Sequence, residues 1–227
     1  ISFLFIVLVF ISKLTLYSRC ILSIYFNFRE LFIMKIVVLK FGGTSVGTIK
    51  KIKKVTEIVA EYQKKNFKVI VVSSAMSGVT NELIKKSKQI SKDFPDEEYD
   101  VLVSSGEQVA CSLIAGSLIQ KGIKARSWLA WQIPILTKGP HKNSRINNIN
   151  TLKVLKYLKE GGIPIITGFQ GVNINEKVTT IGRGGSDASA IMLAKVFKAE
   201  RCVIYTDVEG VYTTDPNKLK KAKKIKV

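Results

Sequence analysis

Apolar strand-like runs alternate with amphipathic helical patterns along most of this chain, and no other feature limits its possible folds as strongly. The clearest run, VVLKF at 37–41, is followed by a helical pattern with Ile52, Val55 and Val59 on one face. Such alternation is typical of a mostly parallel sheet covered by helices on both faces. We therefore expect an α/β fold with strands at 35–41, 68–74, 163–167, 178–181 and 202–206 and helices at 48–65, 81–92, 100–121, 150–159 and 186–197.

Polar, glycine-rich loops follow these expected strands. In a parallel sheet, ligands bind in the loops at the C-terminal ends of the strands. The loops are therefore expected to converge on one edge of the sheet. They cover residues 40–45, 73–81, 167–173, 182–187 and 206–216.

The first of these loops, KFGGTS, has the composition of an anion-binding turn. Glycines let backbone N–H groups approach a ligand closely, and a following helix adds its positive end. Lys40 comes before Gly42 and Gly43, whereas in the common phosphate-binding loop the lysine follows the last glycine. An ordinary strand-to-helix turn is the alternative interpretation.

The loop GRGGSD offers a second charged group. Arg183 stands between glycines, where a guanidinium can hold a carboxylate in bidentate fashion. Gly184 and Gly185 free the backbone, Ser186 caps the start of a helix, and Asp187 lies in its first turn. A simple helix cap on a tight turn explains the same residues.

The remaining candidate functional residues each have an alternative, purely structural interpretation. Glu107 lies among small and apolar residues in SSGEQVACSL. It is either a helix-surface glutamate or a buried carboxylate that meets a cation such as an ammonium group. In TDVEGVYTTDP, Asp207 and the threonines either form a turn-rich loop or contact a nucleotide. His141 is expected to be a loop residue, and Tyr205 and Tyr212 are expected to pack rather than to catalyse.

Composition narrows the classes of function. The net charge of +19 invites a nucleic-acid partner, but the lysines are scattered over expected helix surfaces, so small anionic substrates fit equally well. Cys20, Cys111 and Cys202 form no CxxC pair, which indicates a reducing compartment rather than disulfides or zinc. With His141 as the single histidine, catalytic triads and histidine metal clusters are nearly excluded, and no protein metal site is expected.

Both ends of the chain differ from its body. Residues 1–33 are apolar and aromatic, but the uninterrupted stretch before Lys13 is shorter than the ~20 residues that span a bilayer. Because Met34 precedes a good strand, we expect translation to start there and 1–33 to be upstream sequence. A membrane anchor is the alternative. Residues 218–227 include six lysines and are expected to be a solvated connector, at which a fragment has been cut before its next element.

The motifs KFGGTSV, SSAMSGVTN, SSGE, GFQGVN, TTIGRGGSD and YTDVEGVYTTDP occur in the order expected of aspartokinases. The sequence resembles that family from residue 34 to about 227. Related acetylglutamate, glutamate 5- and uridylate kinases share the sheet and a lysine–glycine loop but not KFGGTSV together with GRGGSD. The resemblance implies phosphoryl transfer from ATP, with Mg²⁺ bridging phosphate oxygens, to L-aspartate. The product would be 4-phospho-L-aspartate, the entry to lysine, threonine and methionine synthesis.

The resemblance also implies a role for each motif residue. Lys40 would bind the transferring phosphoryl group among the N–H groups of Gly42 and Gly43, and Asp187 would orient Lys40. Arg183 would hold the α-carboxylate of aspartate and Glu107 its α-ammonium group. The aspartate pocket would further be lined by Thr44, Ser45, Ser74, Thr80, Phe169 and Ser186, and ATP would be faced by Thr206, Asp207 and Tyr212.

On the same basis we expect 34–227 to be a catalytic domain that is incomplete at its C-terminus and lacks regulatory ACT domains. The whole protein is expected to be a cytoplasmic homo-oligomer with no nucleic-acid or membrane partner. Two alternatives stay open. One is a sibling kinase with another acceptor, against which Arg183 and Glu107 favour a free amino acid. The other is a non-catalytic, ligand-binding or membrane-tethered domain, suggested by the two unusual ends.

Overall fold

The structure, a computed structural model, describes residues 34–182 and 184–207. The chain divides into two units, Ile1–Lys35 and Ile36–Val227, and all the helices and strands described below belong to the second. The apolar segment 1–33 and the lysine-rich segment 218–227 lie outside the described residues. The expectations for both segments therefore stay predictions.

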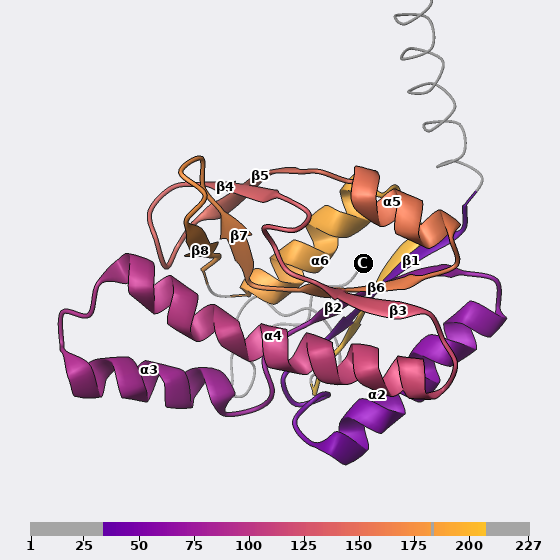
Figure 1. Cartoon of the computed structure of the whole chain (residues 1–227), viewed down its shortest axis with the longest axis horizontal. Helices are drawn as coiled ribbons and strands as arrows, with labels where there is room; N and C mark the ends of the chain where they lie inside the picture. The colour runs from indigo at the N-terminus through magenta and orange to yellow at the C-terminus, as the bar shows by residue number, and fades with distance from the viewer. Residues whose placement is uncertain (1–33, 183, 208–227) are drawn as a thin grey trace, which may run out of the picture. The chain divides into compact units, whose positions relative to one another are not determined.

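Five parallel strands form the central sheet, which confirms the expected α/β fold (Figure 1). β1 is buried along its whole length, because it has a parallel neighbour on each side and helices on both faces. Phe41 of β1 pairs with Ser73 of β2, so the loops after these two strands leave the sheet at the same edge. In spatial order the strands are β3 (Ala125–Trp128), β6 (Ile163–Thr167), β2 (Lys68–Ser73), β1 (Ile36–Phe41) and β9 (Arg201–Tyr205).

Helices cover both faces of this sheet. α2 and α4 lie on one face, and α5 and α6 lie on the other (Figure 1). Alternate residues of β1 (Val37, Leu39 and Phe41) join Val55 and Val59 of α2 in the main apolar core, which explains the helical periodicity of α2. The helices are α2 (Ile49–Lys64), α3 (Val79–Ile90), α4 (Asp96–Gln120), α5 (Leu152–Lys159) and α6 (Gly185–Val196).

α4 is longer than the sequence pattern predicts. It begins at Asp96 rather than at Asp100, because its acidic first turn favours a helix N-terminus without adding apolar periodicity. By length and composition α4 could cross a membrane, but half of its most apolar window is buried inside the protein. Its buried face also carries two acidic residues, Asp100 and Glu107. The apolar character of α4 is therefore accounted for by its contacts with the core.

A second, four-stranded sheet was not expected. The sequence predicts loops between the helices that end at 121 and begin at 150, and it predicts 178–181 as a strand of the parallel sheet. Both predictions are wrong, since the first stretch contains β3 of the parallel sheet together with β4 and β5, and β8 lies in the second sheet. Instead, β4 pairs antiparallel with β5 and parallel with β7, and β7 pairs antiparallel with β8. Most residues of β5, RINNI, are at least partly exposed, so its pairing comes from neighbours rather than from an apolar run. The spatial order is β5 (Arg145–Ile149), β4 (Ile135–Lys138), β7 (Gln170–Val172) and β8 (Val178–Thr180).

Candidate active site

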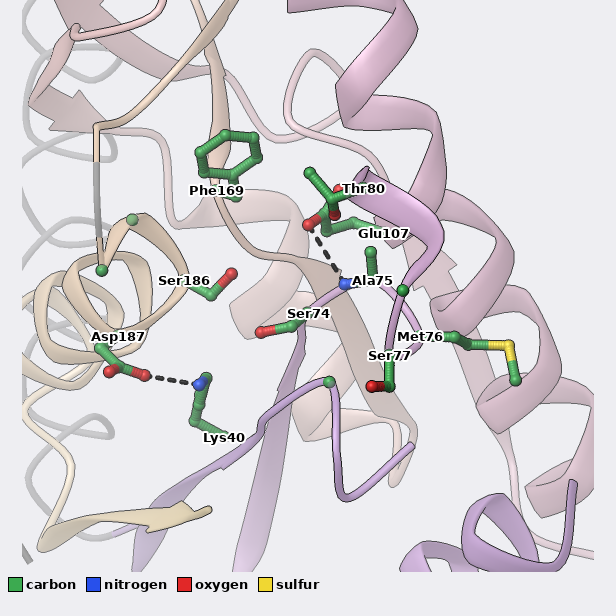
Figure 2. Close-up of a pocket in the computed structure, with 14 residues that line it drawn as sticks. Lys40, Ser74, Ala75, Met76, Ser77, Thr80, Glu107, Phe169, Ser186 and Asp187 are labelled. Carbon is green, nitrogen blue, oxygen red and sulfur yellow. Dashed lines mark hydrogen bonds and ion pairs between the residues drawn. The ribbon is translucent and has the colours of Figure 1, made fainter. Parts of the chain in front are cut away.

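A cavity of about 350 Å³ lies where β1 and β2 end and α6 begins (Figure 2). Loops at the C-terminal ends of β1, β2 and β6 contribute to it, as does the start of α6. One residue, Glu107, comes from α4. The lining residues are Lys40, Gly43, Ser74, Ala75, Met76, Ser77, Gly78, Thr80, Glu107, Phe169, Gly184, Gly185, Ser186 and Asp187.

Lys40 and Asp187 form an ion pair at one side of the cavity. The Lys40 Nζ lies 2.6 Å from Asp187 Oδ1, and the lysine side chain is 8% exposed whereas the aspartate side chain is 45% exposed. Lys40 lies near the end of the buried β1, and Asp187 lies in the first turn of α6, whose positive end faces the same space. The arrangement offers a cation and a helix N-terminus to an anion, with a carboxylate that holds the lysine in place.

Glu107 lies on the other side of the cavity, with Ser74 and Ser186 between it and the ion pair (Figure 2). Its Oε1 accepts a hydrogen bond from the Ala75 N–H at 3.1 Å. Its Oε2 is buried and accepts no hydrogen bond from any residue that the structure describes. Burial raises the pKa of Glu107 to about 7, although the Ala75 N–H lowers it in part. This oxygen can therefore accept a hydrogen bond from a ligand cation.

Glycines allow the walls of the cavity to approach one another. A Cβ at Gly43 would lie 2.9 Å from the Ala75 carbonyl oxygen, and a Cβ at Gly168 would lie 2.9 Å from the Ser186 side chain. Both distances are shorter than real Cβ contacts, so alanine at either position would push a wall of the cavity away. The glycines of these loops therefore have a packing reason that sequence inspection alone does not reveal.

Phe169 shapes the cavity from the end of β6. Its backbone adopts φ of +66°, a conformation that is uncommon for a residue with a Cβ. Two hydrogen bonds hold it there, from the Phe169 N–H to Ser189 Oγ at 3.2 Å and from the Ile181 N–H to the Phe169 carbonyl at 2.8 Å. Its ring also packs against Gly185, where a Cβ would lie 2.8 Å from the ring.

The structure divides the expected site residues between two cavities. Lys40, Gly43, Ser74, Thr80, Glu107, Phe169, Ser186 and Asp187 line the first. Thr44 and Ser45, which we expected in the aspartate pocket, line a second cavity of about 320 Å³. There they lie with Thr206 and Asp207, the residues expected to face ATP. The Ser45 hydroxyl donates to the Tyr205 carbonyl at 3.3 Å and so points toward β9.

The observed contact of Gly42 also differs from its expected role in phosphate binding. Its N–H donates to the Tyr205 carbonyl at 3.0 Å, so it ties the loop to β9 and is not available to a phosphate in this conformation. Tyr205 itself stacks on Phe41 with ring centroids 4.7 Å apart, which confirms its packing role. Two further expected residues, Arg183 and Tyr212, lie outside the described residues, so their proposed contacts stay predictions.

Ala75, Met76, Ser77 and Gly78 of the cavity wall were predicted only as part of the loop 73–81, without individual roles. Their position directly after β2, beside Ser74, is the signal that places them at the site. The described cysteines, Cys111 and Cys202, are free thiols, and no cluster of three or more His, Cys, Asp or Glu residues occurs within 34–182 and 184–207.

The sequence matches the model of the amino acid kinase family over residues 35–227. It is 50% identical over 198 residues to an aspartokinase of Rickettsia conorii, covering 85% of this chain and 49% of that protein. It is 51% identical over 193 residues to an aspartokinase of Geobacillus stearothermophilus, covering 85% and 47%. The chain therefore spans about half the length of the curated relatives it matches.

Solved structures agree with the sequence matches. Escherichia coli aspartokinase III in complex with aspartate and ADP superposes with a TM-score of 0.71 at 28% identity, over 84% of this chain and 53% of that one. The aspartate kinase of Synechocystis gives a TM-score of 0.67 at 38% identity, over 82% of this chain and 31% of that one. An isopentenyl phosphate kinase at 18% identity, with a TM-score of 0.62, shares the fold. The family match, the parallel sheet and the lysine-bearing loop at the sheet edge together show that this chain belongs to the amino acid kinase family.

Proposed function

We propose that this chain is the catalytic part of an aspartate kinase, which transfers the γ-phosphoryl group of ATP to the β-carboxylate of L-aspartate. The observation that carries the proposal is one cavity with the Lys40–Asp187 pair on one side and the buried, available Glu107 oxygen on the other. A cation for phosphate and an anion for an ammonium group suit an amino-acid acceptor. The E. coli relative was solved with aspartate and ADP, which supports the same substrates.

The chemistry needs no general base from the protein. The side chain of aspartate has an ordinary pKa of about 3.9, so the attacking carboxylate is already ionised at neutral pH. One of its oxygens forms a bond to the γ-phosphorus while the bond from that phosphorus to the bridging oxygen of ATP breaks, and ADP leaves with that electron pair. Catalysis then consists of positioning and charge neutralisation.

Each charged residue has a part in this proposal. Lys40 neutralises the transferring phosphoryl group, and Asp187 holds Lys40 in place before substrate binds. Glu107 receives the α-ammonium group, and Arg183 is proposed to hold the α-carboxylate. The half-exposed Asp187 carboxylate is an oxygen ligand of the kind that suits Mg²⁺ carried by ATP phosphates, where the ion would supply further charge neutralisation.

ATP is proposed to extend from this cavity toward the second one, lined by Thr206 and Asp207. Ser74, Thr80, Phe169 and Ser186 are proposed to surround the acceptor. We further propose that the whole protein acts in the cytoplasm, as a homo-oligomer, in lysine, threonine and methionine synthesis.

The test is an acceptor comparison on the full-length protein. It is incubated with Mg-ATP, hydroxylamine and, separately, L-aspartate, L-glutamate or N-acetylglutamate, and the hydroxamate that traps an acyl phosphate is measured. We expect product with L-aspartate alone. Product with L-glutamate would favour a sibling kinase with another free amino acid as acceptor. Product with N-acetylglutamate, whose α-amino group is blocked, would also contradict the role of Glu107. ATP binding without product from any acceptor would favour the non-catalytic alternative.

A further inference from the structure

A second buried carboxylate lies on α4, two helical turns before Glu107. Asp100 is 0% exposed and accepts hydrogen bonds on both oxygens. The Thr180 hydroxyl donates to Oδ1 at 2.5 Å, and Nδ1 of His141 donates to Oδ2 at 2.7 Å. The Lys142 N–H lies 3.1 Å from each oxygen. The sequence pattern indicates only a loop residue at His141, and neither it nor Asp100 lines the cavity.

This cluster holds the chain that leads into the glycine-rich loop. Thr180 is the last residue of β8, and its carbonyl accepts a hydrogen bond from the Ser144 N–H at 3.0 Å. Two residues later, a Cβ at Gly182 would lie 2.4 Å from Oδ1 of Asn143. The segment from Thr180 to Gly182 is thus held between α4 and the loop that joins β4 to β5. Arg183 follows directly.

Asp100 therefore connects the two walls of the cavity. Asp100 and Glu107 are seven residues apart on α4, which places them on the same helix face about 10 Å apart along the axis. One end of this rigid spacer carries Glu107, and the other end holds Thr180, shortly before Gly184 and Gly185 of the cavity wall. We propose that Asp100 is a positioning residue that sets the separation between Glu107 and the glycine-rich loop, and so the fit of the amino-acid substrate. This inference rests on the proposed function.

A carboxylate suits this task better than an apolar residue. It accepts from side-chain donors and a backbone donor on separate parts of the chain, so it specifies their relative positions as well as burying them. Asparagine has the same size, but its NH₂ group would face donors instead of accepting from them. Asp100→Asn should therefore loosen the loop without opening a cavity in the core.

The experiment compares two neighbouring threonines of β8 in the full-length protein. Thr180→Val removes the hydrogen bond to Asp100. Thr179→Val removes the buried hydrogen bond between Thr179 and Thr137, which are 2.6 Å apart and link β8 to β4 rather than to α4. Steady-state kinetics with each substrate, and urea unfolding, are measured for both variants. For Thr180→Val we expect the aspartate KM to rise about tenfold while the ATP KM stays within about twofold, since small misplacements of a binding group weaken substrate positioning.

Thr179→Val should lose similar stability and keep the aspartate KM within about twofold of wild type, because its contact does not reach the glycine-rich loop. Asp100→Asn should reproduce the KM change, and adding Thr180→Val to it should change little more. Equal aspartate KM values for the two valine variants, or parallel changes in both substrates' KM values, would overturn the inference. Wild-type protein inactive with aspartate would overturn the proposed function as well, so the two failures are distinguishable.

Discussion

Lys40 is a buried cation held in place before any substrate arrives. Its side chain is 8% exposed, and its ammonium group lies 2.6 Å from Asp187 Oδ1. Buried charges are tolerated when they are paired, so Asp187 allows β1 to carry a lysine inside the protein. Because Asp187 is half exposed, the pair stays open to the cavity, where a phosphate can share the lysine.

We expect Lys40→Ala to lower kcat by about a thousandfold, because it removes the charge proposed to neutralise the transferring phosphoryl group. Steady-state hydroxamate assays on the full-length protein measure this. Lys53→Ala, which changes an exposed lysine of α2, serves as the control and should keep wild-type kinetics. A normal kcat for Lys40→Ala would show that its role is wrong.

The raised pKa of Glu107 predicts that the folded protein becomes less stable as pH rises. Its pKa is raised from 4.5 to about 7 in the folded protein, so between these values the folded state holds a proton that the unfolded state releases. The free energy of unfolding therefore falls as pH rises through this window. As pH rises from 5 to 8, the free energy of unfolding of Glu107→Gln should therefore increase by about 2 kcal/mol relative to that of wild type.

Urea unfolding of both proteins at the two pH values, without substrate, checks this prediction. Other titrating groups are common to both proteins and cancel in the difference. Glu82→Gln changes a glutamate whose side chain is 65% exposed and should show no such gain. A wild-type-like pH profile for Glu107→Gln would mean that its carboxyl titrates normally.

At the scale of elements, α4 joins the substrate cavity to the core through one glycine. Gly106 lies beside Glu107, and a Cβ there would come within 2.8 Å of the Ala75 Cβ and 3.2 Å of a Val79 methyl group. The helix can therefore press directly on the loop after β2 and on the start of α3. This contact places the Ala75 N–H where it can donate to Glu107.

Two glycines of α4 should respond in opposite ways to alanine. Gly106→Ala overpacks the contact and should lower the free energy of unfolding by about 1–3 kcal/mol. Gly116 is exposed, and a Cβ there would meet nothing within 4 Å, so Gly116→Ala should raise the free energy of unfolding by up to about 1 kcal/mol through helix propensity. Urea unfolding measures both, and a stabilising Gly106→Ala would contradict the close packing.

At the scale of the whole molecule, charge repulsion should outweigh the surface ion pairs. The net charge is +19, and exposed pairs such as Lys86–Glu82 and Lys124–Glu160 contribute little to stability, because water and salt screen them. Raising NaCl from about 20 to about 200 mM should therefore increase the free energy of unfolding, by about 1 kcal/mol, because salt screens the repulsion.

Urea titrations at the two salt concentrations measure this change. A variant with Lys50, Lys53 and Lys85 changed to glutamine carries three fewer positive charges on helix surfaces and should respond less to salt. A decrease in stability with salt would show that the ion pairs dominate instead.

Local patterns were sufficient to predict strands β1, β2, β6 and β9 of the parallel sheet, its helices and the loops at its edge, but not the short edge strand β3. A continuous β-branched run such as that of β1 predicts a strand buried on both faces, and Asp187 three residues after Gly184 predicts the first turn of a helix. These features depend on residues that are close in the sequence. The second sheet depends on partners instead, since the polar strand β5 has no apolar run of its own and forms only beside β4.

The site shows the same division. Adjacent residues pointed to Lys40, Glu107 and Asp187 as chemically interesting, because their types and neighbours are visible in the sequence. The family resemblance implied that Asp187 meets Lys40, whereas the residues by themselves did not, and the structure pairs the two side chains. Folding alone turned Ser45 away toward β9, because side-chain direction depends on which strands are neighbours. A motif therefore identifies which residues have suitable chemistry, whereas packing between distant segments sets which of them share a cavity.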